Sequence, residues 1–465
     1  MGLLIKCLTT ASLYLGWLSY PNLPENYLGG NKFFIHSGIN KFVTKVVCPI
    51  TEKTHDWDQI TCVRKTNKFL SNGFLKTDFI LNSLISTGPP SVNFETHFIA
   101  GTETIVATPK SWTPETGSNI FYYHGGFHTT ESIFDLQNKN FVHKLAEKTN
   151  CRVFAPDYRL SPENKFPESF DDSYAVTLQV LADPKYWNIE GDNFALIGDE
   201  SGGQIAISVS MRLVMDSMDN ARLLAPIYPV TGSHLFNYTE SQVRNGGHFQ
   251  QEFFENSIFA GLQYDLRNEE ELVHLRDLMK NPIIMDKEWA EEYSGYANKY
   301  LPKYYPRGSV VRPNYQPISL ENSIHSESDS YKRFSNYKKL SISEKKFIND
   351  YRNFMRDYRF GNVKMTDEYL ERYLRHAPKH HFYATAENDI FRDEGLIMYH
   401  RLADLNAGID RSSGGVVEGV DFEVFDMENV SSGVFKLSKT FGGSIGDFDG
   451  VADEWLGKVE AFMRV

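Results

Sequence analysis

The segment Gly198-Asp199-Glu200-Ser201-Gly202-Gly203 lies between two segments of different periodicity. The apolar run from Asn193 to Ile197 predicts a buried strand, and the spacing of apolar residues from Gln204 to Met215 predicts a helix. Three glycines within this short segment allow the chain to turn sharply between the two elements. A turn of this kind lifts one side chain above the end of the strand, where it can meet a ligand.

Strands and helices alternate along much of the chain. Short apolar runs predict strands at Ser118–Tyr123, Arg152–Ala155, Arg222–Tyr228, His381–Thr385 and Phe422–Phe425. Helical spacing of apolar residues predicts helices at Ile133–Lys148, Ser169–Ala182, Glu394–Ala407 and Val451–Met463. This alternation predicts an α/β fold with a mostly parallel central sheet and helices on both faces. The alternation stops after Pro229, and the polar, partly helical stretch that follows predicts a cap over the carboxyl edge of the sheet, where such sheets bind ligands.

Two further motifs follow predicted strands. Tyr123-His124-Gly125-Gly126 offers backbone N–H groups that no side chain shields, and such groups can stabilise a developing oxyanion. Asn388-Asp389-Ile390-Phe391-Arg392-Asp393 follows the strand at His381–Thr385. Together with the turn at Gly198–Gly203 and the segment Asp157-Tyr158-Arg159-Leu160-Ser161-Pro162, these motifs occur in an order that resembles the hormone-sensitive-lipase group of α/β-hydrolases, and in particular its arylacetamide-deacetylase-like members.

The resemblance covers nearly the whole chain and is weakest in the cap. It implies an α/β-hydrolase fold, a carboxylic-ester hydrolase activity and a Ser-Asp-His triad, but only the acid matches that pattern, at Asp389. Glu200 stands at the nucleophile position, Ser432 stands at the histidine position, and Phe127 replaces the third glycine of the oxyanion turn. The chain has 14 histidines, and none follows His400.

A serine nucleophile needs a base to take its proton. We therefore predict a hydrolase-family protein that is inactive or weakly active. Ser201, next to the turn, is the remaining candidate nucleophile, although its position also suits the start of a helix. Glu200 is either a carboxylate that faces a ligand or a drifted residue in an abandoned site, and Asp389 is expected to bind local backbone or Ser432.

The other residues of the predicted site have supporting roles. We expect His124 to hold its loop, Gly125 and Gly126 to retain an anion-binding nest with the N–H group of Ser201, and Phe127 to fill part of a pocket. The ligand would be a small apolar ester or another hydrophobic molecule. Two alternatives to a hydrolase remain open, namely a small-molecule binding protein or receptor that keeps the pocket, and a structural interaction protein.

Composition and charge narrow the list of partners. The 465 residues include 48 Lys and Arg against 60 Asp and Glu, a net charge of −12, and no basic stripe offsets it. Nucleic acid is therefore not expected as a partner. We also expect no metal ion and no cofactor in this site.

The N-terminal segment provides information on the cellular compartment of the protein. Residues 1–20 are mostly apolar and precede Pro21 and Pro24, which favours a signal-anchor over a buried helix, with a cleaved signal peptide as a further alternative. The sequons at Asn237 and Asn429 are consistent with lumenal exposure. We predict a protein of the endoplasmic reticulum membrane that faces the lumen, or alternatively a secreted one. Whether Cys48 and Cys62 pair stays open.

The predicted domains follow from these segments. Residues 1–20 form the anchor or signal peptide, and residues 21–91 contribute to the cap. Residues 92–229 and 379–465 form the two parts of the hydrolase core, and residues 230–378 form the inserted cap.

Overall fold

The computed structural model describes residue 43 and residues 47–55, 57–73, 91–115, 117–189, 191–232, 249–279, 282–305, 340–409, 420–428, 430, 433–437 and 449–464. The predicted anchor at residues 1–20, both sequons and Ser432 lie outside these ranges. The division into domains stays a prediction.

The core is an eight-stranded sheet with the strand order β1-β2-β4-β3-β5-β6-β7-β8. The strands are β1 (Val92–Ile99), β2 (Thr102–Pro109), β3 (Asn119–Tyr123), β4 (Arg152–Pro156), β5 (Phe194–Asp199), β6 (Leu223–Ile227), β7 (His380–Ala386) and β8 (Asp421–Met427). β1 and β2 pair antiparallel, as do β2 and β4, and all other neighbours are parallel. The predicted mostly parallel sheet is confirmed, whereas the antiparallel β1–β2 hairpin was not predicted.

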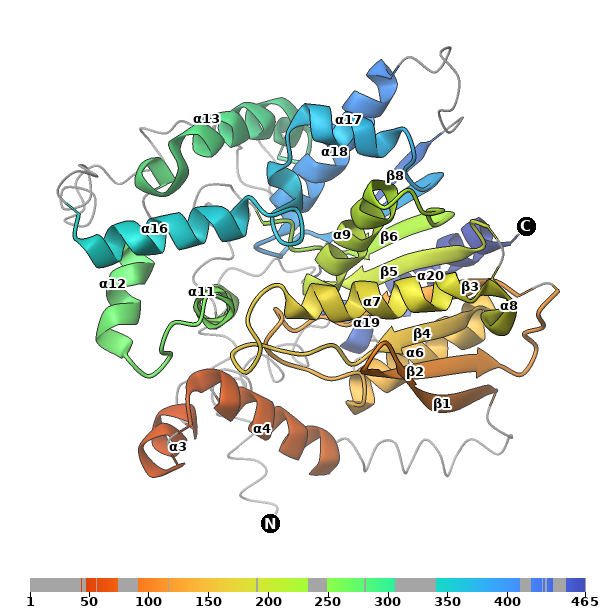
Figure 1. The fold of residues 1–465 in the computed structure, drawn as a ribbon, viewed down its shortest axis with the longest axis horizontal. Helices are drawn as coiled ribbons and strands as arrows, with labels where there is room; N and C mark the ends of the chain where they lie inside the picture. The colour runs from red at the N-terminus through yellow and green to blue at the C-terminus, as the bar shows by residue number, and fades with distance from the viewer. Residues whose placement is uncertain are drawn as a thin grey trace.

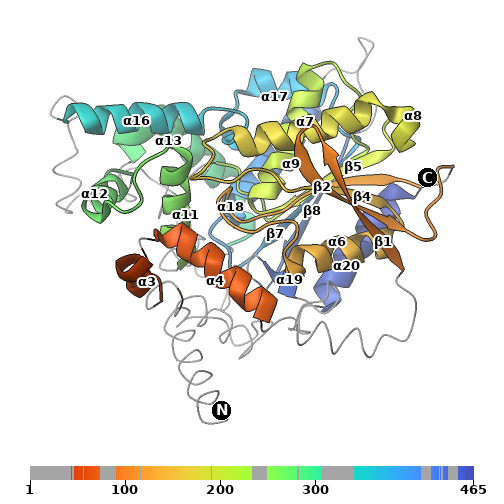
Figure 2. The same cartoon turned by 60° about the horizontal axis from the view of Figure 1, so that its bottom comes forward.

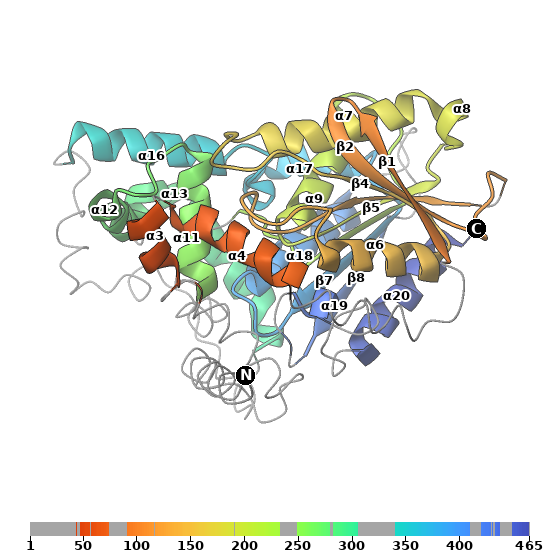
Figure 3. The same cartoon turned by 90° about the horizontal axis from the view of Figure 1, so that it is seen from below.

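Helices cover both faces of this sheet (Figures 1 and 3). One face packs against α7 (Glu168–Ala182), α9 (Ser201–Met215), α17 (Asp367–Leu374) and α18 (Arg392–Gly408), and the other against α6 (Leu136–Thr149), α19 (Val434–Leu437) and α20 (Asp449–Met463). β5 and β6 are buried along their whole length because they lie in the middle of the sheet with helices on both sides. The short helix α8 (Pro184–Trp187) follows α7.

Helices between β6 and β7 gather beyond one edge of the sheet, at the left of Figure 1. They are α11 (Phe249–Gly261), α12 (Glu269–Met279), α13 (Pro282–Tyr300) and α16 (Ile342–Met355), with the 3-10 turns Leu301–Lys303 and Asn362–Lys364. α11, α12 and α16 form an apolar cluster that also contains Ile390 and Phe391, the residues after Asp389. The inserted helices therefore reach the loop that follows β7.

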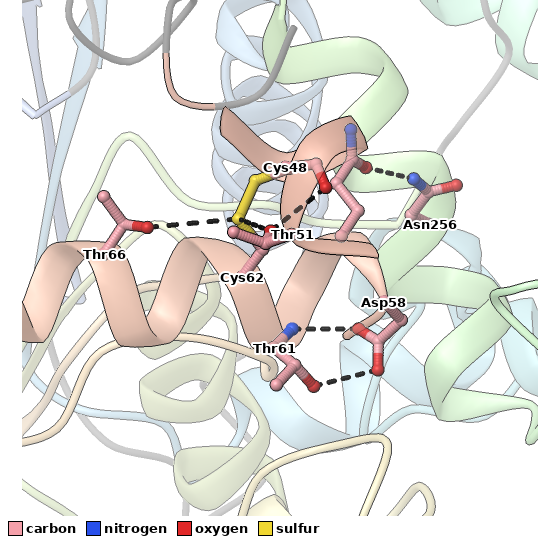
Figure 4. Close-up of a disulfide and its surroundings, with 8 residues drawn as sticks. Cys48, Thr51, Asp58, Thr61, Cys62, Thr66 and Asn256 are labelled. Carbon is pink, nitrogen blue, oxygen red and sulfur yellow. Dashed lines mark hydrogen bonds between the residues drawn. A yellow bond between two sulfur atoms is a disulfide. The ribbon is translucent and has the colours of Figure 1, made fainter. Parts of the chain in front are cut away.

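A disulfide between Cys48 and Cys62 joins α3 (Cys48–His55) to α4 (Gln59–Gly73) (Figure 4). Closing a loop of this size stabilises a fold by about 3 kcal/mol in the chain-entropy account. Figure 2 shows the helix pair lying beside α11, against which its apolar residues pack. The side chain of Asn256, on α11, also donates a hydrogen bond to Gln59.

Arg64 connects this helix pair to the loops around the site. Its guanidinium donates to the carbonyl oxygens of Thr129 and Ser161 and pairs with the Glu163 carboxylate at 2.6 Å. Residues 21–91 were predicted to contribute to the cap, and the helix pair α3–α4 within that range lies against α11.

Across the described ranges, no helix combines the length and the apolarity needed to cross a bilayer.

Two glycine substitutions test how closely the turn after β5 is packed. A Cβ on Gly202 would lie 2.0 Å from the Tyr123 carbonyl oxygen, whereas a Cβ on Gly457, inside α20, would meet no atom within 4 Å. Gly202→Ala should therefore lower the free energy of unfolding by about 2 kcal/mol or more. Gly457→Ala should raise it by up to about 1 kcal/mol, because alanine favours helix over glycine.

Urea unfolding of both variants beside the wild type measures these differences. Equal effects of the two substitutions would contradict the close contact at Gly202.

Candidate functional site

The turn between β5 and α9 consists of one residue. β5 ends at Asp199 and α9 begins at Ser201, so Glu200 alone joins them, with φ 53° and ψ −117°. Residues other than glycine rarely adopt a positive φ, and such strain is often found at functional sites. A Cβ on Gly198 would lie 2.1 Å from the carbonyl oxygen of Gly202, so the turn has no room for a side chain there. Glu200 is therefore the apex of the turn.

The Gly-rich turn after β3 lies directly against this apex. A Cβ on Gly125 would lie 2.9 Å from Oδ2 of Asp199 and 3.1 Å from Oε2 of Glu200, so both carboxyl groups approach the same backbone position. The Gly126 N–H group donates to Oε2 of Glu200 at 3.3 Å. A donor expected to face an oxyanion therefore already binds a side chain of the protein.

Glu200 and Ser201 differ in accessibility. Glu200 is only partly buried, whereas Asp199 and Ser201 are each 1% exposed. The Ser201 hydroxyl accepts a hydrogen bond from the backbone N–H of His128 at 3.3 Å. The carboxyl group at the apex thus reaches accessible space, and the neighbouring hydroxyl is held inside the fold.

Three aromatic rings meet beside the Gly-rich turn. Phe127 follows Gly126, and its ring centroid lies 5.2 Å from that of Phe254 and 5.8 Å from that of Phe391. The rings of Phe254 and Phe391 are 5.0 Å apart. These three residues, the aromatic trio, come from the turn after β3, from α11 and from the loop after β7. Phe127 therefore joins the core to the inserted helices.

His124 is part of the support for the Gly-rich turn. Its ring is fully buried, stacks on Tyr158 at 4.2 Å between centroids, and approaches the Gly125 carbonyl oxygen at 2.7 Å through Nδ1. His128 lies nearby, with its ring nitrogens against Ser169 at 2.9 Å and Gln204 at 2.6 Å. Burial lowers the pKa of His128 to about 4. Both rings are engaged in the scaffold.

Asp389 lies at the same edge of the sheet as Glu200, since both follow parallel strands. It is fully buried, its N–H donates to the Ala386 carbonyl oxygen at 3.2 Å, and its charge helps to raise the pKa of Glu200. The Asn388 N–H donates to the Val430 carbonyl oxygen at 2.8 Å, which joins this loop to the segment after β8. Ser432 follows in that segment, outside the described residues, so its predicted place beside Asp389 stays a prediction.

A buried lysine from α19 lies beneath the turn. The Lys436 ammonium is 2.7 Å from Oδ2 of Asp199 and 2.6 Å from Oε2 of Glu131, and the Tyr122 hydroxyl donates to Oδ1 of Asp199 at 2.6 Å. Burial alone would lower the pKa of Lys436, but the carboxylates of Asp199 and Glu131 raise it well above its usual value. Burial alone would raise the pKa of Glu131, but Lys436 and His124 lower it.

The electrostatic environment of Glu200 differs from that of Glu131, because the pKa of Glu200 is raised and that of Glu131 is lowered. Burial raises the pKa of Glu200 to about 8, the negative charges of Asp199 and Glu131 add to the effect, and the more distant Lys436 opposes it. The two ion pairs of Lys436 are made with the other two carboxylates, and among the described residues the Glu200 carboxyl group has only the backbone N–H of Gly126 as a hydrogen-bond partner. The neutral form of Glu200 therefore predominates near pH 7.

Comparison with known proteins agrees with this architecture. Residues 120–264 match the sequence family described as the alpha/beta hydrolase fold. The chain has the α/β-hydrolase fold. It is similar to arylacetamide deacetylase of Mus musculus, with 22% identity over 72% of this chain and 77% of that protein.

Other relatives of this α/β-hydrolase are matched over shorter stretches. Carboxylesterase 20 of Arabidopsis thaliana is 25% identical over 37% of this chain and 45% of its own length. The match covers between 28% and 52% of the length of four curated relatives. Among solved structures, carboxyl esterase 2 of Tuber melanosporum aligns with a TM-score of 0.47 and 15% identity, over 81% of this chain and 88% of that one.

The ionic partners in this site were not predicted from the sequence. Asp199 was quoted only as part of the turn, and neither Glu131 nor Lys436 was considered. The one available signal was a lysine in a short apolar segment, Val434-Phe435-Lys436-Leu437, shortly after the position expected for a catalytic histidine. A lysine among apolar residues is usually exposed through its flexible stem, so this signal was weak.

Removal of the buried ammonium tests the ionic cluster. Lys436→Met should lower the free energy of unfolding by about 3–5 kcal/mol, because Asp199 and Glu131 would be left without their cation. The deficit should be smallest at acidic pH and should grow as pH rises above about 4.5, the ordinary pKa of a glutamate side chain, because without Lys436 the partly buried Glu131 ionises at a cost.

Lys458→Met is the matched control, since Lys458 pairs with Glu423 at the surface. Chemical denaturation at several pH values should show a loss of at most about 1 kcal/mol for this control. A Lys436→Met variant as stable as the control would contradict the assigned pairing.

Proposed function

We propose that this protein keeps the binding site of a carboxylesterase-like α/β-hydrolase and holds a small apolar ligand there without hydrolysing it. The single observation that carries the proposal is the position of Glu200, which is the apex of the turn and accepts the Gly126 N–H group at 3.3 Å. The side chain at the nucleophile position thus competes with an oxyanion for its donor.

The chemistry of acyl transfer argues against catalysis here. A nucleophile must lose a proton to a base, and the leaving group must gain one. Among the described residues, no histidine ring is hydrogen-bonded to Glu200 or Ser201. The ring of His128, two residues after Gly126, is already hydrogen-bonded to Ser169 and Gln204. Glu200 as a nucleophile would form an ester that needs an activated water, and among the described residues no histidine is placed to activate it.

Ligand binding is favoured over a purely structural role by the accessibility of the apex. Glu200 is partly accessible while its neighbours on both sides are buried, and Phe127, which follows Gly126 and is also partly exposed, supplies apolar surface near the Gly-rich turn. Small-molecule sites typically combine apolar walls with a few polar groups.

Esterase assays test the proposal directly. With short p-nitrophenyl esters the wild type should hydrolyse at the background rate, and Ser201→Ala should not change that rate. The double variant Glu200→Ser plus Ser432→His should exceed the wild type by at least about tenfold, since it supplies both a nucleophile and a base.

Glu200→Ser alone is the control and should stay near background, because the serine lacks a base. Robust wild-type turnover that disappears in Ser201→Ala would overturn the proposal, since Ser201 would then be the nucleophile.

We further propose that the protein resides at the endoplasmic reticulum membrane and faces the lumen. Three features support this placement, namely the apolar segment at residues 1–20, the sequons, and the disulfide between Cys48 and Cys62, which forms and persists in oxidising compartments. Secretion after cleavage of the segment is the alternative.

Expression in a eukaryotic cell tests this placement. Deglycosylation should increase the electrophoretic mobility of the wild type, and Asn237→Gln should reduce that shift, because glycans are added only in the lumen. The protein should stay with membranes after an alkaline wash, and release into the medium would instead support secretion. An unglycosylated protein in the cytosol would contradict both the placement at the endoplasmic reticulum membrane and secretion.

A further inference from the structure

The two oxygens of the Glu200 carboxyl group have different environments. Oε2 accepts the Gly126 N–H group at 3.3 Å. Oε1 has no hydrogen-bond partner within the described part of the chain, and Glu200 is partly accessible, so this oxygen is the polar atom available to a ligand. A protonated carboxyl group would accept through Oε2 and donate through Oε1.

Charge around Glu200 decides which protonation state is present. The carboxyl groups of Asp199, Glu131 and Asp389 all act on it, and Lys436 is the ammonium that opposes them. Lys436 contacts Asp199 at 2.7 Å and Glu131 at 2.6 Å, and it forms no ion pair with Glu200. An ionised Glu200 would add a further negative charge to a cluster that already has more acids than cations, at a low local dielectric.

The groups that face this cluster come from every element around it. They are Tyr122 on β3, His124, Glu131 and Asp135 in the segment between β3 and α6, Tyr158 after β4, Asp199 on β5, Tyr228 after β6, Asp389 after β7 and Lys436 on α19. Tyr122 is itself a donor to Asp199, and the pKa of Tyr228 is raised by burial and by the same carboxylates, so neither supplies positive charge. Lys436 is thus the cation that balances the acids.

We propose that Glu200 is a neutral hydrogen-bond donor and that its site binds a neutral, aromatic or otherwise apolar molecule through a carbonyl oxygen. This inference rests on the proposed binding function and adds the chemical class of the ligand. Phe127, the partly exposed member of the aromatic trio, contacts the apolar part, and Oε1 of Glu200 donates to the carbonyl group. An anionic ligand is rejected by the surrounding carboxylates, and a cationic ligand finds no ionised partner at the apex.

The raised pKa of Glu200, about 8, adds a pH dependence to this site. The donor is present below that pH and is lost above it, so binding of a carbonyl ligand should weaken as pH rises. The contribution of Glu200 to the stability of the fold also decreases as pH rises. A carboxyl group whose pKa is higher in the folded state than in the unfolded chain stabilises the fold at acidic pH, and this stabilisation is lost between about pH 4.5 and pH 8.

Three probes that share a phenylethyl group test the ligand class by calorimetry on the full-length protein. They are 4-phenyl-2-butanone, which is neutral and only accepts hydrogen bonds, the anion 3-phenylpropionate and the cation 3-phenylpropylamine. The ketone should bind at about pH 6 and bind roughly 30-fold more weakly at about pH 9.5, where only a few per cent of Glu200 retains its proton. The two charged probes should bind at least about tenfold more weakly than the ketone at about pH 6.

Substitutions of Glu200 distinguish the loss of its hydrogen-bond donor from a general effect on the fold. Glu200→Gln keeps a neutral donor that does not titrate, so it should bind the ketone with little dependence on pH. Glu200→Leu removes the donor and should weaken binding at least about tenfold at acidic pH. Glu371→Gln, at an exposed position on α17, is the control and should match the wild type. Tighter binding of the amine than of the ketone at about pH 6 would overturn the donor role and leave a binding function in place.

A ligand-independent measurement keeps the inference falsifiable. In protein labelled with ¹³C at the glutamate carboxyl carbon, the signal missing from Glu200→Gln should titrate with a midpoint above about pH 7. A midpoint below about pH 6 would overturn the inference whatever binds. If the midpoint is high and none of the three probes binds, the ligand class and the binding function both fail, while the esterase assays still decide separately whether hydrolysis occurs.

Discussion

The buried ammonium of Lys436 is the contact on which the site depends. It joins three parts of the chain, because it extends from α19 near the C-terminus and binds Asp199 at the end of β5 and Glu131 in the segment before α6. Buried carboxylates are tolerated only with a partner or a proton. Lys436 provides the partner for two of them, which leaves the proton as the solution for Glu200.

The helices outside the sheet depend on a second set of contacts. The Cys48–Cys62 disulfide holds α3 to α4, and Arg64 of that pair binds the carbonyl oxygen of Thr129 just after the Gly-rich turn. Phe127 lies in the same turn and packs against α11. The segment before the core, the inserted helices and the turn that faces Glu200 are therefore mechanically linked, so a change in any one of them should alter the site.

We propose that the fold and the hydrolytic chemistry have separated in this protein. The α/β-hydrolase architecture is retained down to the one-residue turn at Glu200 and its close approach to the Gly-rich turn, whose Gly126 N–H group is now engaged by the Glu200 carboxyl. Glu200 and Ser432 stand where the resemblance to hydrolases of this fold predicts the nucleophile and the histidine. A strained turn that presents a nucleophile in hydrolases of this fold can equally present a hydrogen-bond donor, because the backbone sets the position of the side chain and the side chain sets the chemistry.

Periodicity along the chain determined the fold class, since strands such as Phe194–Asp199 and helices such as Ser201–Met215 depend mainly on local patterns of apolar residues and glycines. The same patterns placed Glu200 at the turn and Asp389 after β7. Only the tertiary structure decided what surrounds Glu200. Glu131 and Lys436 are separated by about 300 residues, and their meeting at Asp199 depends on how the strands are ordered in the sheet. Electrostatic effects act through space and depend on burial, so neither the charge balance nor the protonation of Glu200 could be obtained from sequence spacing.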